Sequence, residues 1–163
     1  MSEKSNEEYH KRILIVDDEE MVLTSLSSFL ALETEYEVKT FTTAKEALDY
    51  ISKNPVDLVI SDYLMSEMDG ISFLARVKEI NPNAPRILLT GYADKENAIK
   101  AINDVGLYQY IEKPWDNDDL KIIIRNGLEK QRLLHELQNK IDEIQKAYGD
   151  LHKLHRDILK AFA

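Results

Sequence analysis

The chain has 163 residues, a net charge of −9 at pH 7 and no cysteine. This length predicts one domain with an appendage, and the lack of cysteine excludes a disulfide framework and a thiolate metal site. No apolar run approaches the ~20 residues that a membrane span needs. Residues 1–11, a predicted flexible leader, lack the apolar core of a secretion signal. Together these features favour a cytoplasmic location.

The negative charge is concentrated in the first part of the chain. Residues 128–163 carry seven basic and six acidic side chains, a net charge of +1, so residues 1–127 carry −10 and the whole chain carries −9. Neither part has the basic stripe that is typical of a protein that contacts nucleic acid. We therefore expect no direct nucleic-acid binding by this segment and no membrane association.

Five short apolar runs alternate along the chain with segments of helical periodicity. The predicted strands cover Arg12–Val16, Tyr36–Phe41, Leu58–Ser61, Arg86–Thr90 and Gln109–Glu112. Apolar residues at helical spacing follow each strand, and prolines after Asn54 and Asn81 end two of the helices. This alternation predicts an α/β fold of the flavodoxin-like kind, with a doubly wound, five-stranded parallel sheet covered by helices on both faces.

Polar side chains stand at the carboxyl ends of four predicted strands. They are Asp17 and Asp18 after the first strand, Asp62 after the third, Thr90 on the fourth and Lys113 after the fifth. The carboxyl ends of parallel strands share one edge, so we expect these groups to meet there. Carboxylates this close need a cation, and Mg²⁺ prefers a few carboxylates, water and phosphate oxygens. With a lysine and a hydroxyl nearby, the pattern predicts a Mg²⁺-dependent aspartyl-phosphate site.

This ordered set resembles the receiver domain of two-component response regulators. Met68-Asp69-Gly70, Thr90-Gly91 and Lys113-Pro114 extend the resemblance, which covers residues 12–127. It implies a signalling switch that accepts a phosphoryl group from a sensor histidine kinase or a phosphotransfer protein. The only catalysis implied is of the domain's own aspartyl phosphorylation and dephosphorylation.

The resemblance also implies a ligand set for Mg²⁺. Asp62 would be the phosphoacceptor and would contact the ion. Asp18 would bind the ion directly, and Asp17 would bind it through water. The backbone carbonyl of Leu64 would be a further ligand.

Three other residues take roles around the phosphoryl group by the same resemblance. Lys113 would pair with the acceptor carboxylate and later with the phosphoryl group, and the bond between Lys113 and Pro114 is expected to be cis. Thr90 would hydrogen-bond a phosphoryl oxygen. Tyr110 matches the aromatic residue that swings inward on activation, although a half-buried strand aromatic would give the same pattern.

Other functions on this fold require residues that the chain lacks. A phosphatase that forms an aspartyl phosphate usually has a second acidic residue two positions after the nucleophile, where Leu64 stands. A flavodoxin would need a phosphate-binding loop where Asp17-Asp18-Glu19-Glu20 would repel phosphate, and a nucleotide hydrolase would need a glycine-rich loop with lysine. Two alternatives stay open, namely a phosphatase on this fold that forms an aspartyl phosphate and a dimerisation scaffold that is never phosphorylated.

Residues 128–163 predict an amphipathic coiled-coil helix. Nine positions are spaced alternately by three and four, and eight of them are apolar or aromatic. These seam positions are Leu134, Leu137, Ile141, Ile144, Tyr148, Leu151, His155, Ile158 and Phe162. The seam predicts a homodimer with parallel helices. The helix is expected either to link the receiver to an output domain beyond Ala163 or to be the coiled coil through which a complete protein acts. Gly127 is the predicted point where phosphorylation would turn or bend the join.

Overall fold

Five parallel strands form one sheet in the order β2-β1-β3-β4-β5. The computed structural model describes residues 10–162, apart from the side chains of Tyr92 and Val105, so most of the predicted leader lies outside the described residues. The strands are β1 (Arg12–Val16), β2 (Glu37–Phe41), β3 (Leu58–Asp62), β4 (Arg86–Thr90) and β5 (Gln109–Glu112). The predicted flavodoxin-like fold is therefore confirmed, and the predicted strands differ from the observed ones by one residue at most.

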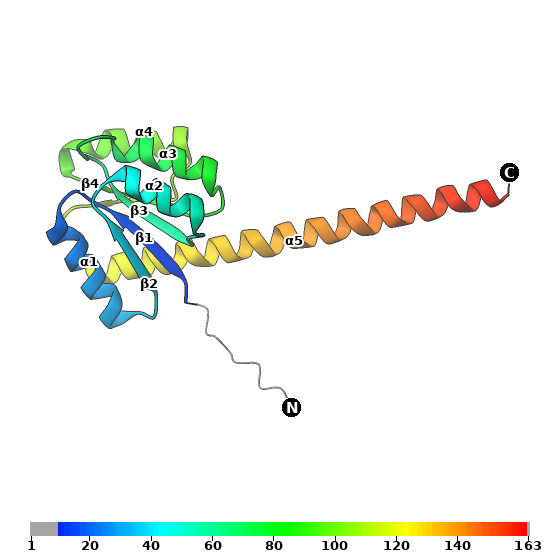
Figure 1. Ribbon diagram of the computed structural model, residues 1–163, viewed down its shortest axis with the longest axis horizontal. Helices are drawn as coiled ribbons and strands as arrows, with labels where there is room; N and C mark the ends of the chain where they lie inside the picture. The colour runs from blue at the N-terminus through cyan, green and yellow to red at the C-terminus, as the bar shows by residue number, and fades with distance from the viewer. Residues whose placement is uncertain (1–9, 163) are drawn as a thin grey trace, which may run out of the picture.

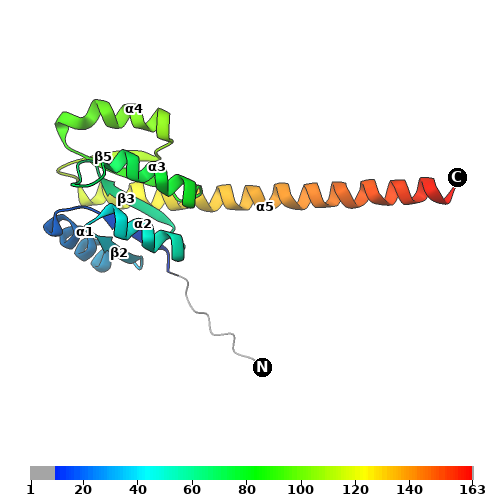
Figure 2. The same ribbon diagram turned by 45° about the horizontal axis from the view of Figure 1, so that its top comes forward.

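Helices cover both faces of the sheet (Figures 1 and 2). They are α1 (Glu20–Glu33), α2 (Ala44–Lys53), α3 (Gly70–Ile80), α4 (Lys95–Val105) and α5 (Asn117–Ala161), with a short 3₁₀ turn, η1 (Tyr92–Asp94). One apolar core lies between the sheet and α2, α3 and α4, and a second lies between the sheet and α1 and α5. Three helices begin at a side chain that accepts a hydrogen bond from the first turn, namely Thr43, Asp69 and Asp116, as such N-terminal residues commonly do.

The two central strands β3 and β4 are buried at every residue. Strands in the middle of a parallel sheet are covered on both faces, which explains their unbroken apolar runs. In the register of the sheet Val16 pairs with Ser61, Asp62 with Leu89, and Thr90 with Glu112. The polar residues at or just after these positions, which are Asp17, Asp62, Thr90 and Lys113, therefore lie along one edge of the sheet.

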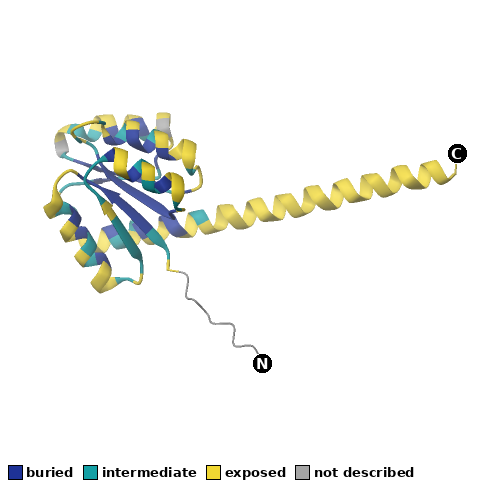
Figure 3. Cartoon of the chain, viewed as in Figure 1, coloured by how far each residue is buried: buried dark blue, intermediate teal, exposed yellow. Residues whose placement is uncertain are grey.

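Helix α5 is much longer than the domain it belongs to (Figures 1 and 3). It runs unbroken for 45 residues, and Leu120, Ile124 and Leu128 bury its first part against the sheet. From residue 132 to residue 162 every side chain is exposed. The long C-terminal helix is therefore confirmed. None of the described helices is long and apolar enough to span a membrane.

Gly127 lies inside α5 where the helix crosses the sheet. A Cβ added there would be 3.2 Å from Leu58 Cδ1 and 3.2 Å from Tyr108 Cε1. The glycine is buried and the helix continues through it. The structure thus gives Gly127 a packing role, because it lets the α5 backbone approach the sheet closely. The turn or bend that phosphorylation would cause near this residue stays a prediction.

We expect Gly127→Val to lower the free energy of unfolding of the domain by about 1–3 kcal/mol, the usual cost of overpacking. Urea unfolding followed by the fluorescence of the single tryptophan, Trp115, measures this. Gly149→Val is the matched control, because it lies in the same helix and an added Cβ there has nothing within 4 Å. Equal stabilities for the two variants would show that Gly127 is not needed for packing.

Candidate functional site

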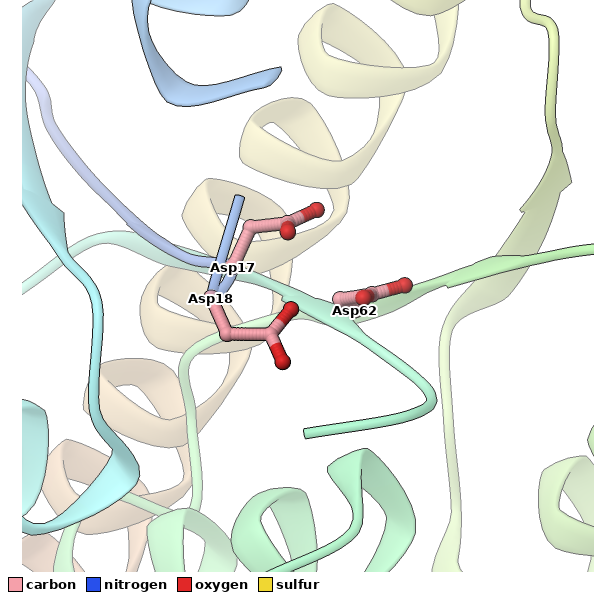
Figure 4. Close-up of side chains that lie close together, drawn as sticks. All are labelled: Asp17, Asp18 and Asp62. Atoms are coloured by element: carbon pink, nitrogen blue, oxygen red, sulfur yellow. The ribbon is translucent and has the colours of Figure 1, made fainter. Parts of the chain in front are cut away.

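Three carboxylates converge at the carboxyl edge of the sheet. Asp17 and Asp18 follow β1 and Asp62 ends β3 (Figure 4). One carboxylate oxygen of each residue lies within 4.8 Å of those of the other two. Asp17 is fully buried and Asp62 is 7% exposed, whereas Asp18 is exposed. The cluster is therefore anchored in the core and open to solvent on one side.

Backbone hydrogen bonds hold two of these carboxylates. Asp17 Oδ1 accepts from the N–H of Glu19 at 2.9 Å, where α1 is about to begin. Asp62 Oδ1 accepts from the N–H of Tyr63 at 3.0 Å. These bonds orient the side chains from within their own loops, so the strand ends themselves determine where the charges stand.

Gly70 closes the loop that follows Asp62. Its N–H donates to the carbonyl of Tyr63 at 2.7 Å, and a Cβ added to Gly70 would lie only 2.0 Å from the backbone oxygen of Asp62. Only glycine allows this approach. The side chain of Ser61 also supports the loop, since its hydroxyl donates to the carbonyl of Asp62 at 2.9 Å. Ser61 was not singled out from the sequence, although a polar residue in a buried strand was a usable signal.

Lys113 neutralises part of the acidic cluster. Its Nζ lies 2.9 Å from Asp62 Oδ1 and 3.2 Å from Asp17 Oδ2. Burial alone would lower the pKa of Lys113, but the hydrogen bond to Asp62 and the charges of Asp17 and Asp62 hold it above its ordinary value. Lys113 therefore stays protonated at neutral pH. The Lys113–Pro114 bond is cis, as the resemblance implied.

The buried position of Asp17 disfavours its negative charge. Burial raises the pKa of Asp17, and the N–H of Glu19 opposes this shift. The charge of Asp62 raises the pKa further, whereas Lys113 lowers it. The net shift is upward, so ionised Asp17 is held at a cost that a further cation would relieve.

Thr90 and Tyr110 lie on the strands next to the cluster. Thr90 is fully buried, and its Oγ1 has no hydrogen-bond partner among the described residues. Its carbonyl accepts from the N–H of Lys113 at 2.7 Å, which places the two residues side by side. Tyr110 is half-buried and packs on the core beneath α3 and α4. The side chain of Leu64 is 62% exposed beside the loop.

Comparisons with known proteins place the chain in a family and support the fold described above. The family described as the response regulator receiver domain matches residues 13–125. The chain therefore belongs to the response regulator receiver family, and it is a component of two-component signal transduction. Nothing in the comparisons supports a phosphatase.

Similar proteins include longer regulatory proteins. The hydrogenase transcriptional regulatory protein HoxA of Cupriavidus necator is 34% identical over 142 residues, which cover 87% of this chain and 26% of that protein. The regulatory protein AtoC of Escherichia coli K12 is 36% identical over 128 residues, covering 78% and 27%. The chain thus spans about 26–30% of the length of the curated relatives that it matches.

Solved structures show the same fold. The signal receiver domain of an HD domain-containing protein from Pseudomonas fluorescens Pf-5 is 38% identical with a TM-score of 0.71, and the match covers 76% of this chain and 98% of that one. NtrX from Brucella abortus is 31% identical with a TM-score of 0.74, covering 80% of this chain and 29% of NtrX.

We expect Asp17→Asn to make the folded protein more stable at pH 7 in buffer with EDTA. A carboxyl whose pKa is raised by folding weakens the folded state as it ionises. This cost is absent below the ordinary value of 3.8 and complete above the folded-state pKa of Asp17. The advantage of the variant should therefore disappear as the pH falls below about 4.

Urea unfolding at pH 7 and at pH 3.5 measures the difference between the variant and the parent. Asp49→Asn serves as the control, because Asp49 is exposed on α2 and the same change should be almost neutral there. A less stable Asp17→Asn at pH 7 would mean that the pairing with Lys113 outweighs the burial of Asp17.

Proposed function

We propose that Asp62 accepts a phosphoryl group from a histidine kinase or a phosphotransfer protein, and that this reaction switches the domain. The observation that carries the proposal is the pairing of Asp62 with Lys113 at 2.9 Å inside a cluster of three carboxylates. A carboxylate oxygen of Asp62 attacks phosphorus, and the bond from phosphorus to the donor breaks.

The donor set fits Mg²⁺. The three carboxylates are hard oxygen ligands, one of them is open to solvent, and a few such ligands with water are what Mg²⁺ prefers. Asp18 and Asp62 would hold the ion directly, Asp17 through water, and Leu64 through its carbonyl. When bound, the ion would neutralise the carboxylates and draw negative charge from the phosphoryl oxygens.

The chain's own residues would act on the phosphoryl group from the other side. Lys113 is protonated, and its Nζ already lies beside Asp62. It would therefore pair with a phosphoryl oxygen on Asp62 without further rearrangement. The buried, unpartnered hydroxyl of Thr90 would donate to another oxygen. Movement of Thr90 toward the site would make room for Tyr110 to turn inward from its half-buried position.

We further propose that residues 12–127 are the receiver and that residues 128–163 form a coiled coil with a second copy of the chain. The eight apolar or aromatic seam positions are 38–87% exposed in a single chain. Leu133 and Leu154 widen the stripe, and both are more than half exposed. A helix that exposes this much apolar surface needs a partner that covers it. The same helix of a second copy of the chain would cover it, with the two helices parallel and both receivers at one end.

A small phosphodonor such as acetyl phosphate with Mg²⁺ should label the protein once, on Asp62. Intact mass and peptide mapping under acidic conditions measure the label. Asp62→Asn should abolish it, because the amide is not a nucleophile. The exposed variant Asp49→Asn should be labelled like the parent. Label that persists in Asp62→Asn would refute the assignment.

Ile144→Lys combined with Leu151→Lys should convert a dimer into a monomer, because two charges per helix would enter the seam. Sedimentation velocity measures the mass. Asn139→Lys with Gly149→Lys is the matched control, because it adds the same two charges to the same helix outside the seam, and it should stay dimeric. The seam variant should still accept phosphate. An unchanged dimer would place the interface on the receiver.

A further inference from the structure

One position of the seam on α5 is polar. His155 lies between Leu151 and Ile158 in the alternating spacing of three and four, whereas the other eight seam positions are apolar or aromatic. In a single chain His155 is exposed, and so are Leu151 at 64% and Ile158 at 47%. The imidazole is therefore solvated in one chain, and its place in the seam becomes important only when a partner covers the helix.

The coiled coil proposed above would enclose His155 among apolar side chains, and the present inference rests on that coiled coil. In a parallel pair of helices, each seam side chain inserts into a hole formed by four residues of the facing helix. For His155 this hole would consist of four residues of the second copy, which are Leu151, Leu154, His155 and Ile158. Three of them are apolar. The imidazole of the second copy would thus be the only polar side chain within reach.

The charged side chains near His155 lie away from the seam. Those within one heptad on either side are Asp150, Lys153, Arg156, Asp157 and Lys160. All five occupy heptad positions outside the seam and its two flanks. The other titratable groups on the seam side are Tyr148 and His152, whose rings stack with their centres 6.2 Å apart. The second copy would present the same residues, so no carboxylate of either helix would face His155.

We propose that the two His155 side chains of the dimer face each other as neutral imidazoles and form one hydrogen bond across the seam. One ring donates its N–H, and the other accepts with its unprotonated nitrogen. An apolar helix of another protein, or a second copy in a shifted register, would leave the buried imidazole without a partner, which costs free energy. His155 would therefore select a second copy of this chain, parallel and in register, as single polar seam residues do.

Protonation would break this pair. Two charged imidazoles can only donate, they repel each other, and no carboxylate in the seam compensates them. The dimer would therefore bind fewer protons than two separate chains, so a fall in pH favours the separate chains. Histidine takes up its proton between about pH 5 and pH 8, a range in which aspartate and glutamate side chains ordinarily stay ionised.

The dissociation constant of the dimer at two pH values tests the proposal. Sedimentation equilibrium of the fluorescently labelled whole chain, diluted from micromolar to nanomolar, measures Kd at pH 7.5 and at pH 5.5. We expect Kd to rise about 10- to 100-fold at the lower pH, because up to two protons per dimer are linked to dissociation. A monomer at both pH values would contradict the coiled coil and the histidine pair with it. A dimer with the same Kd at both pH values would overturn the pair alone.

Three variants locate the titrating group. His155→Leu should dimerise with the same Kd at both pH values, because no charge can enter the seam. His155→Asn keeps a polar pair that does not titrate, so its Kd should also be independent of pH. His152→Gln is the matched control, since it removes a histidine from the flank on which Gln138 and Gln145 already stand, and it should respond like the parent. A full pH response in His155→Leu would place the titrating group elsewhere.

A single introduced cysteine tests the register, because the chain has no other. In parallel helices that are in register, Leu137→Cys would bring two thiols face to face across the seam, so a glutathione redox buffer should cross-link the dimer. Adding His155→Leu should lower the cross-linked fraction, because other registers then no longer bury an unpaired imidazole. An unchanged fraction in the double variant would show that His155 does not select the register.

Discussion

The convergence of Asp17, Asp18 and Asp62 is the constraint on which the rest of the structure depends. Three carboxylates within 4.8 Å repel one another, and the fold holds two of them in buried positions. It can do so because β1 and β3 are neighbours in the sheet, at the point where the order of the strands reverses. Lys113 reaches across from β5 to offset part of the repulsion. One lysine therefore faces three carboxylates, and the negative charge that remains favours the binding of a cation.

The sequence predicts those features that depend on local pattern. Apolar runs followed by Asp17, Asp62 and Lys113 identify both the strands and the edge where their chemistry meets, and the structure brings these three side chains together. The heptad spacing likewise predicts the length of α5. Features that depend on packing between distant segments were not predictable. The low helix propensity of glycine suggested that Gly127 is a weak point of the helix, whereas the structure shows that it packs closely against the sheet. The buried guanidinium of Arg86 could be recognised only once its neighbours in space were known.

Helix α5 joins the domain to the exposed seam without an intervening loop. Its inner face is core as far as Leu128, and from residue 132 it has no contact with the sheet that buries it. Arg132 reinforces the helix at this transition, with hydrogen bonds of 2.6 Å to both Glu129 and Glu136. Such pairs across one turn stabilise an exposed helix modestly. The domain and the seam are therefore joined by one continuous helix that side-chain hydrogen bonds stabilise at the transition.

The part of α5 that projects from the domain is much longer than the part that the sheet holds. The 30 residues from 132 to 161 extend roughly 45 Å at the helical rise per residue, while only the first turns are held by the sheet. A tilt of about 5° at the base would then displace the far end by roughly 4 Å, which follows from the same length. A rearrangement too small to disturb the core would thus change the separation or register of whatever lies beside the tip. The length of α5 would therefore enlarge any small movement at its base into a larger displacement at its far end.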